Sequence, residues 1–183
     1  MTVALRLGGR LDAEALAAAL ADVVARHESL RTIFPDIDGV PLQLVVASER
    51  AGFGWEVVDA TGWAAAQLGE AIDAAARHPF DLATEIPLRA RLFRVTDEEH
   101  VLVGVVHHIA ADGWSITPLV GDLGVAYASR CAGQAPGWAP LPVQYVDYTL
   151  WQRAQLGDLA DSDSRIAAQL AYWEQALAGL PER

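Results

Sequence analysis

The sequence predicts an α/β fold, on the strength of three observations. Residues 101–106, Val-Leu-Val-Gly-Val-Val, form a continuous rather than alternating run of β-formers, which is typical of a strand buried on both faces. A tight polar turn follows, and apolar residues then recur at helical spacing over 116–127. The chain shows no internal repeats or long linkers. We therefore expect a single α/β sandwich over residues 1–183.

The first elements are a strand and a helix. Residues 2–7 alternate in character, which predicts a strand. Asp12 is the expected N-cap of a helix, with Leu11 placed to pack onto Leu16. The predicted buried stripe of this helix comprises Leu16, Leu20, Val23, Val24, His27 and Leu30. On this stripe His27 is expected to be packed and hydrogen-bonded rather than catalytic.

The middle of the chain predicts mixed structure. The expected elements are a turn over 34–39, strands over 41–46 and 55–59, a helix over 63–77, and strands over 88–95 and 101–106. Leu68 and Ile72 face inward from the helix, which Pro79 ends. The last two strands are separated by a short polar stretch, so we expect a hairpin that delivers His107 and His108 to the end of the sheet.

The remaining residues predict a loop and two helices. Residues 132–142 are rich in Gly and Pro, a helix is expected over 143–156, and a polar break over 157–163 precedes a last helix marked by Ile166, Leu170, Trp173 and Leu177. Aromatic residues of the first of these helices, Tyr145, Tyr148 and Trp151, are expected to pack in the core.

Composition and charge exclude several classes of protein. A hydrophobic content of 52% argues against disorder, and no apolar run approaches the length of a membrane span. The net charge is −11, with 24 acidic and 13 basic residues and no Lys/Arg block, which disfavours nucleic-acid binding. The single cysteine, Cys131, cannot form an internal disulfide, and no secretory signal opens the chain, so we expect a cytoplasmic protein.

The stretch from Val105 to Ser115 carries the chemistry. His107 and His108 are adjacent at the strand end, so their side chains are expected to point to opposite faces, one packing and the other facing a cavity. Asp112 offers a carboxylate to a nearby cation, and Gly113 allows backbone or ligand to approach closely. Strand ends followed by a turn and a helix are a common place for active sites in α/β proteins.

These residues alone leave alternatives open. Two core histidines with satisfied hydrogen bonds would give the same pattern, because histidine is often buried. A metal site is disfavoured, since neighbouring side chains that point apart cannot easily chelate one ion and the single cysteine adds no ligand cluster. Ser115 is better explained as a helix N-cap than as a nucleophile, because it lacks a G-x-S-x-G context.

The motif H-H-x-x-x-D-G, formed by His107, His108, Asp112 and Gly113, resembles the signature of the chloramphenicol-acetyltransferase-like acyltransferases. With Trp114 and Ser115 it most resembles the condensation domains of nonribosomal peptide synthetases. Further matches, all in family order, are R-H-E-S-L-R-T-I-F over 26–34, P-F-D-L over 79–82, P-L-R-A-R-L over 87–92, Y-V-D-Y-T-L-W-Q-R over 145–153 and Y-W-E-Q-A-L-A-G-L-P over 172–181.

The resemblance implies a two-layer α/β sandwich of the chloramphenicol-acetyltransferase type, forming the amino-terminal lobe of a V-shaped domain. It also implies amide bond formation between a donor thioester and an acceptor amine, each carried on the phosphopantetheine arm of a peptidyl carrier protein, in pathways to antibiotics and other secondary metabolites. The substrates meet in a tunnel that passes His108, which acts as base or as positioner of the amine. Gly113 would offer a backbone N–H to the oxyanion, and no metal or bound organic cofactor is implied.

The family pattern also implies how the signature is supported. The first arginine of R-H-E comes from a helix beside the signature turn, so Arg26 is predicted to pair with Asp112. Asp112 would then be structural, and loss of either partner would cost stability before chemistry. Arg31, Trp114 and Ser115 are the other residues expected to support the site.

The subtype that fits best is condensation. Heterocyclising relatives carry D-x-x-x-x-D in place of the signature, epimerisation relatives follow it with a pattern other than Trp114-Ser115, and recruitment relatives that bind an oxygenase have a degraded signature. The run from Pro118 to Arg153 most resembles domains whose donor ends in a D-residue. Alternatives are a non-catalytic recruitment module, an epimerisation relative, and an acyltransferase acting on a free alcohol or amine.

Two features limit the resemblance. The opening family motif S-x-A-Q-x-R-x-W is absent, and the match ends near Pro181, before the family's carboxy-terminal lobe. We expect the partners to be that lobe, donor and acceptor carrier proteins and adjacent synthetase domains. The isolated lobe is expected to expose an apolar face, to self-associate and to show little or no catalysis. The residues do not identify the amino acids joined or the product.

Overall fold

The computed structural model describes residues 1–181 and divides the chain into two compact units. The first unit, residues 1–141, contains the whole sheet and three of the helices. The second unit begins at Pro142 and contains the last two helices. The mixed α/β class is therefore confirmed, whereas the single sandwich expected over the entire chain occupies the first unit only.

A four-stranded sheet forms the centre of the first unit. Its strands lie in the order β1 (Thr2–Gly8), β8 (Glu99–Val106), β7 (Leu88–Arg94) and β6 (Gly54–Asp59). Strand β8 is antiparallel to both neighbours, with Leu88 opposite Val106 in the predicted hairpin, and β6 runs parallel to β7. The strands predicted at 2–7, 55–59, 88–95 and 101–106 are thus confirmed, and β8 is internal to the sheet.

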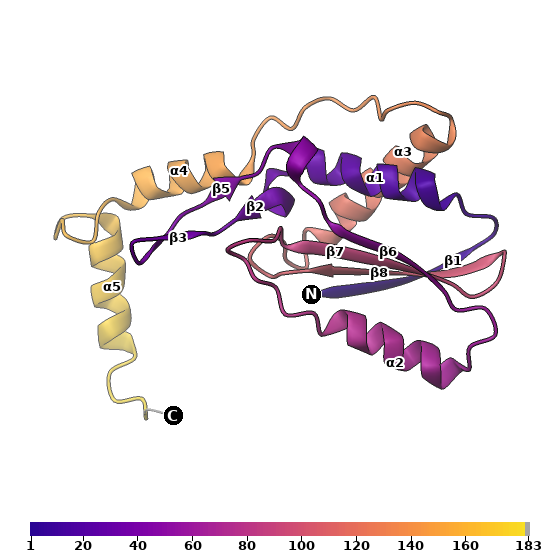
Figure 1. The fold of residues 1–183 in the computed structure, drawn as a ribbon. Coiled ribbons are helices and arrows are strands. Elements are labelled where there is room, and N and C mark those ends of the chain that lie inside the picture. The colour runs from indigo at the N-terminus through magenta and orange to yellow at the C-terminus, as the bar shows by residue number, and fades with distance from the viewer. Residues whose placement is uncertain (182–183) are drawn as a thin grey trace. The chain divides into compact units, whose positions relative to one another are not determined.

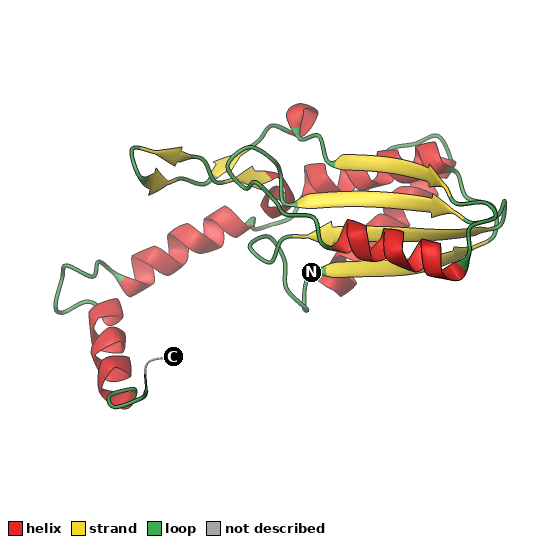
Figure 2. Ribbon diagram, turned by 60° about the horizontal axis from the view of Figure 1, so that its bottom comes forward, coloured by secondary structure: helices red, strands yellow, loops and turns green. Residues whose placement is uncertain are grey.

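Helices cover both faces of this sheet (Figures 1 and 2). Helices α1 (Ala13–Arg26) and α3 (Ile116–Cys131) lie against one face, and α2 (Ala65–Ala76) lies against the other. Alternate residues of β8 serve the two faces: Leu102 packs with Leu16 and Leu20, whereas Val101, Val103 and Val105 pack with Leu68 and Ile72. The continuous apolar run of this strand is explained by burial on both sides, and α2 adds a layer to the two expected.

Helix α1 begins and packs as its sequence predicts. The Asp12 carboxylate accepts hydrogen bonds from the backbone N–H groups of Glu14 and Ala15, at 3.0 and 2.9 Å. This N-cap satisfies two of the donors that a helix start leaves without a partner. Four side chains of the predicted stripe are buried in the helix, namely Leu16, Leu20, Val23 and Val24, and Leu30 is buried in the 3-10 turn η1 (Glu28–Arg31) that follows.

Short strands connect α1 to β6. Strand β2 (Thr32–Ile33) pairs with β5 (Leu44–Val45), and β3 (Asp36–Ile37) pairs with β4 (Val40–Pro41), before the 3-10 turn η2 (Ser48–Arg50). The tip between β3 and β4 places Asp38 and Gly39 at φ values of 55° and 81°. Both residue types tolerate this left-handed conformation, so the stretch predicted as a turn forms a small hairpin.

The second unit consists of α4 (Tyr145–Leu156) and α5 (Arg165–Ala176). The prediction that the α4 aromatics lie in a core is wrong, because Tyr145, Tyr148 and Trp151 are 55%, 41% and 59% exposed. They contact one another instead, with centroids 5.9 and 5.8 Å apart along the helix. Two helices of this length cannot by themselves enclose their apolar side chains. No helix within residues 1–181 combines the length and apolar character needed to cross a bilayer.

Candidate functional site

The candidate site lies where the central strand β8 ends. The backbone N–H of Val106, its last residue, donates to the Met1 carbonyl at 2.9 Å, and the N–H of His107 donates to the Pro87 carbonyl at 2.9 Å. The chain then leaves the sheet and turns through residues 108–115 before α3 begins at Ile116. The two histidines therefore stand at the boundary between a strand held on both sides and an exposed turn.

His107 and His108 have different environments. The His107 ring is half-buried and meets the Phe80 ring edge-on, with centroids 5.9 Å apart and planes at 84°. Its Nδ1 accepts the backbone N–H of Ile109 at 3.1 Å. A backbone N–H can only donate, so Nδ1 carries no proton and the neutral ring holds its proton on Nε2. His108 is exposed, and no group in the described part of the chain hydrogen-bonds its ring.

The hydrogen bonds to the Asp112 carboxylate all come from its own turn. One carboxylate oxygen accepts the Ser115 hydroxyl at 2.8 Å and the backbone N–H groups of Ser115 and Trp114, each at 3.1 Å. The Ser115 hydroxyl chiefly, then these N–H groups and the nearby His108, lower the pKa of the Asp112 carboxyl from its usual value, although some loss of hydration opposes them. The carboxylate form is thereby favoured, next to His108 and without a partner from another element.

Two predictions about this turn are wrong. Arg26 does not pair with Asp112, because its guanidinium bonds Asp122 and the Ala139 carbonyl, and the donors on Asp112 Oδ1 all come from its own turn. Ser115 stands at the start of α3 but its side chain does not cap the helix, because its hydroxyl donates to the Asp112 side chain and accepts the Asp112 N–H at 3.0 Å. Its backbone is already helical, whereas an N-cap residue is usually extended.

Arg26 instead joins α1 to α3. Its Nε lies 2.9 Å from Oδ2 of Asp122, its Nη1 donates to the Ala139 carbonyl at 2.6 Å, and its guanidinium lies 4.7 Å from the Trp138 ring centroid. His27 contacts the same Asp122 oxygen through Nε2 at 2.7 Å. The expected hydrogen-bonded role of His27 is confirmed. Asp122, the shared partner, was missed by sequence reasoning because an acidic residue on a helix carries no distinguishing signal.

Arg31, Trp114 and Gly113, which were also predicted to serve the site, make no hydrogen bond, ion pair or ring contact with the two histidines in the described part of the chain. Arg31 donates to the Val46 carbonyl at 2.6 Å and to Glu28 at 3.3 Å, so it fastens the segment beside β5. Trp114 is 90% exposed. A Cβ at Gly113 would meet no atom within 4 Å, so the turn itself does not require glycine there. Any steric need for Gly113 must come from a bound ligand or partner.

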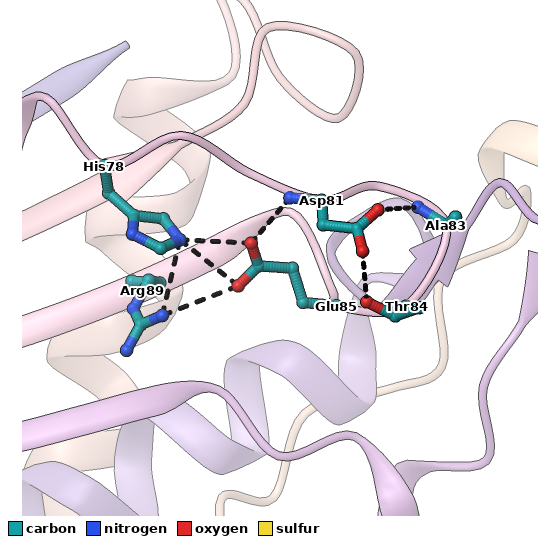
Figure 3. Close-up of polar contacts among 6 residues, drawn as sticks. All are labelled: His78, Asp81, Ala83, Thr84, Glu85 and Arg89. Atoms are coloured by element: carbon teal, nitrogen blue, oxygen red, sulfur yellow. Dashed lines mark hydrogen bonds and ion pairs between the residues drawn. The ribbon is translucent and has the colours of Figure 1, made fainter.

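Figure 3 shows a polar cluster that the sequence did not indicate. Its His78 meets the Phe80 ring, which in turn meets the His107 ring. Nε2 of His78 faces both Glu85 carboxylate oxygens at 3.1 and 3.2 Å, and Nη1 of Arg89 lies 3.3 Å from His78 and 3.5 Å from Glu85. Asp81 donates its N–H to Glu85 at 2.7 Å. These residues lie in or near the P-F-D-L and P-L-R-A-R-L motifs. The two motifs were the only feature of the sequence that could have pointed to this cluster.

The arrangement is suited to proton exchange and orientation. An exposed imidazole at a strand end can donate or accept a hydrogen bond, and imidazole is the side chain most often used for proton transfer in enzymes. The half-buried ring of His107 has a defined tautomer and defined contacts. Within residues 1–181, no three His, Cys, Asp or Glu side chains are grouped as metal ligands would be.

The chain is similar over its whole length to known proteins. The family model described as Condensation domain matches residues 1–183. An isonitrile lipopeptide synthase of Mycobacterium tuberculosis (strain ATCC 25618 / H37Rv) is 73% identical over 183 residues, which are 100% of this chain and 7% of that protein. A dimodular nonribosomal peptide synthase of Bacillus subtilis (strain 168) is 50% identical over 181 residues, covering 99% of this chain and 8% of that protein.

Among solved structures, the X-domain from teicoplanin biosynthesis is 40% identical, with a TM-score of 0.89. The match covers 100% of this chain and 39% of that one, and the same domain has been determined in a complex with OxyB. The chain therefore spans less than half the length of each of these relatives.

Proposed function

Because the chain belongs to the condensation-domain family, we propose that it supplies the amino-terminal lobe of a site that joins two carrier-bound substrates by an amide bond. The donor is an acyl or peptidyl thioester and the acceptor is an aminoacyl group, each on the phosphopantetheine arm of a peptidyl carrier protein. The acceptor nitrogen attacks the thioester carbonyl, the C–N bond forms and the C–S bond breaks. The proton lost by the amine is balanced by the thiol that leaves.

The observation that carries this proposal is the exposed ring of His108 at the end of the buried central strand. The ring is accessible while its neighbour His107 is packed, so a substrate amine can reach one imidazole directly after the residue at which the chain is last bonded to its neighbours in the sheet. His108 would accept the amine proton or orient the amine and the tetrahedral intermediate.

The remaining signature residues would shape the turn and the oxyanion site. His107 and Asp112 would hold the two ends of the turn through their hydrogen bonds with Ile109 and Ser115. The open space around Gly113 is consistent with a backbone N–H placed against the developing oxyanion, where a fixed donor is most effective. Arg26, through Asp122, would support the turn indirectly by fixing α1 against the helix that follows it.

The proposed partners are the donor and acceptor carrier proteins, adjacent synthetase domains and the second lobe of the condensation domain. The names of the synthases that match this chain support this assignment. We infer that the site uses no bound metal or organic cofactor of its own and works in the cytoplasm, where peptide synthetases meet their loaded carriers.

The test is dipeptide formation from two loaded carrier proteins by a condensation domain of full family length that carries these residues. We expect the native protein to form the amide and His108→Ala to keep its fold and carrier binding but to lose about 100-fold or more in rate. His27→Ala is the control for loss of an imidazole outside the site. The proposal fails if the native protein binds carriers without forming peptide, or if His108→Ala is as fast as native.

A second function is favoured by one observation. The similarity to the X-domain, determined in a complex with OxyB, supports a non-catalytic module that recruits a partner enzyme. The intact pair His107 and His108, with Asp112 and Gly113, favours catalysis. The same assay separates the two functions, because a recruitment module would capture a partner enzyme in a pull-down while forming no peptide with any donor.

A further inference from the structure

The segment between α2 and β7 contacts His107 at two points. Pro87 accepts the backbone N–H of His107 at 2.9 Å, and Phe80 meets its ring edge-on. The backbone contact sets where the chain leaves the sheet, and the ring contact limits the side-chain rotamer. Both contacts come from the P-F-D-L and P-L-R motifs, which the proposed mechanism does not otherwise use.

This segment has no strand or helix of its own, and side-chain bonds add to the backbone turn bonds that Thr84 and Glu85 donate to the Asp81 carbonyl. The Glu85 carboxylate is the centre: it receives the Asp81 N–H and faces both His78 and Arg89 (Figure 3). Asp81 in turn accepts the Thr84 hydroxyl at 2.8 Å. The side chains of His78 and Glu85 are only 25% and 29% exposed, so these bonds are partly shielded from water.

Arg89 links this segment to the sheet. It belongs to β7 opposite Gly54 at the start of β6. A Cβ at Gly54 would lie 2.5 Å from Nε of Arg89. The glycine therefore leaves room for the guanidinium to lie over the strand and reach His78 and Glu85.

A continuous series of ring contacts leads from this cluster to the site. His78 meets Phe80 edge-on at 4.9 Å between centroids and 85° between planes, and Phe80 meets His107 in the same manner. The Phe80 ring is thus held between two imidazoles. With its ring held this way, His107 presents Nδ1 to the Ile109 N–H, which fixes the turn on which His108 stands.

We propose that His78, Glu85 and Arg89 are positioning residues for the condensation reaction, acting through Phe80 and Pro87 on His107 and thereby on the turn that carries His108. This inference rests on the proposed function. The cluster contacts no reacting atom; it sets the tautomer and orientation of the first signature histidine.

The experiment uses the same full-length condensation domain and the variants Phe80→Leu and Glu85→Gln. Leucine preserves apolar bulk without a ring edge, and glutamine preserves size without charge. Glu56→Gln is the matched control, since Glu56 pairs with Arg91 of β7 at 2.6 Å without a path to His107. Readouts are kcat and KM in the carrier assay, thermal unfolding, and the ¹⁵N resonances of His107, assigned by His107→Gln.

We expect both test variants to lower kcat by about tenfold or more with KM unchanged, because small displacements of catalytic groups are costly. Their His107 resonances should shift from the Nε2-protonated tautomer toward a mixture, while Glu56→Gln changes neither quantity. Unchanged His107 resonances in both test variants, or an equal loss of kcat in Glu56→Gln, would overturn the inference. If the native domain forms no peptide, the proposed function fails, and the His107 resonances still decide whether the cluster positions this ring.

Discussion

The charge state of Asp112 is set by donors within three residues of it. The Ser115 hydroxyl and the N–H groups of Ser115 and Trp114 converge on one oxygen, and no cation from another element is involved. A short turn that bonds its own carboxylate through three donors can keep its shape when neighbouring elements move. The anion beside His108 is therefore a property of the signature turn itself.

Replacing Ser115 with alanine should raise the pKa of Asp112 toward its ordinary value, because the hydroxyl is the largest cause of the lowered pKa. A carboxyl with a lowered folded-state pKa adds stability above its unfolded pKa and loses it as pH falls through the folded value. Ser115→Ala should therefore flatten the acid side of the stability curve. Carboxyl ¹³C titration of Asp112 measures the shift directly.

Asp59 is the internal reference for that titration. Thr61, chiefly, and Arg94 lower its pKa to about 2, and it lies at the far end of β6. Its titration should not change in Ser115→Ala. An unchanged Asp112 titration would mean that the hydroxyl bond does not control this carboxyl.

Between elements, ion pairs hold α1 against α3. Arg26 and His27 share Asp122, and Arg130 of α3 makes two bonds to Asp22 of α1, at 2.7 and 2.6 Å. The Arg26 and Asp122 side chains are 14% and 23% exposed. An ion pair that is mostly removed from water is costly to break from one side, because the remaining charge loses its partner.

Asp122→Ala should lower the free energy of unfolding by about 2–3 kcal/mol, somewhat less than for a fully buried pair. Asp112→Ala should cost less, since its carboxylate is exposed and bonded only within its turn. Chemical denaturation of the two variants makes the comparison. A larger loss of unfolding free energy in Asp112→Ala would contradict this assignment and favour the ion pair between Arg26 and Asp112 that the family pattern implies.

The elements were predictable because their signals are local. The alternation over residues 2–7, the Asp12 cap and the apolar run of β8 each depend on neighbouring residues, and all were confirmed. The partner of Arg26 was not predictable, since Asp112 precedes α3, Asp122 lies within it, and only packing selects between them. The cluster of His78, Glu85 and Arg89 was missed because each residue alone is an ordinary polar side chain.

At the level of the whole molecule, apolar side chains are exposed on the second unit. The largest on α4, α5 and the residues that follow α5 are Tyr145, Leu150, Trp151, Tyr172, Trp173, Leu177 and Leu180, each at least half exposed. The helical spacing of these apolar residues could be read from the sequence. The protein surface against which they pack could not. Exposed apolar groups of this kind favour association with another protein surface.

The 183-residue chain should therefore self-associate in solution, and Trp151→Ser with Trp173→Ser should shift it toward monomer. Sedimentation velocity over a range of concentrations measures the change. Val57→Ser is the control, because Val57 is 49% exposed on β6 of the first unit. If Val57→Ser shifts the protein toward monomer as much as the double tryptophan variant does, or if the native chain stays monomeric, these helices do not mediate association.

The position of His107 at the end of β8 has a consequence for hydrogen exchange. Amides of an internal strand bonded on both sides exchange slowly, because they exchange only when the sheet opens. The amide of His107 is still bonded, to Pro87, whereas within residues 1–181 that of His108 has no acceptor. Protection should fall steeply between these two neighbouring amides. A ligand that orders the turn would then slow exchange from His108 onward while leaving the strand unchanged, which gives a signal for substrate binding that needs no turnover.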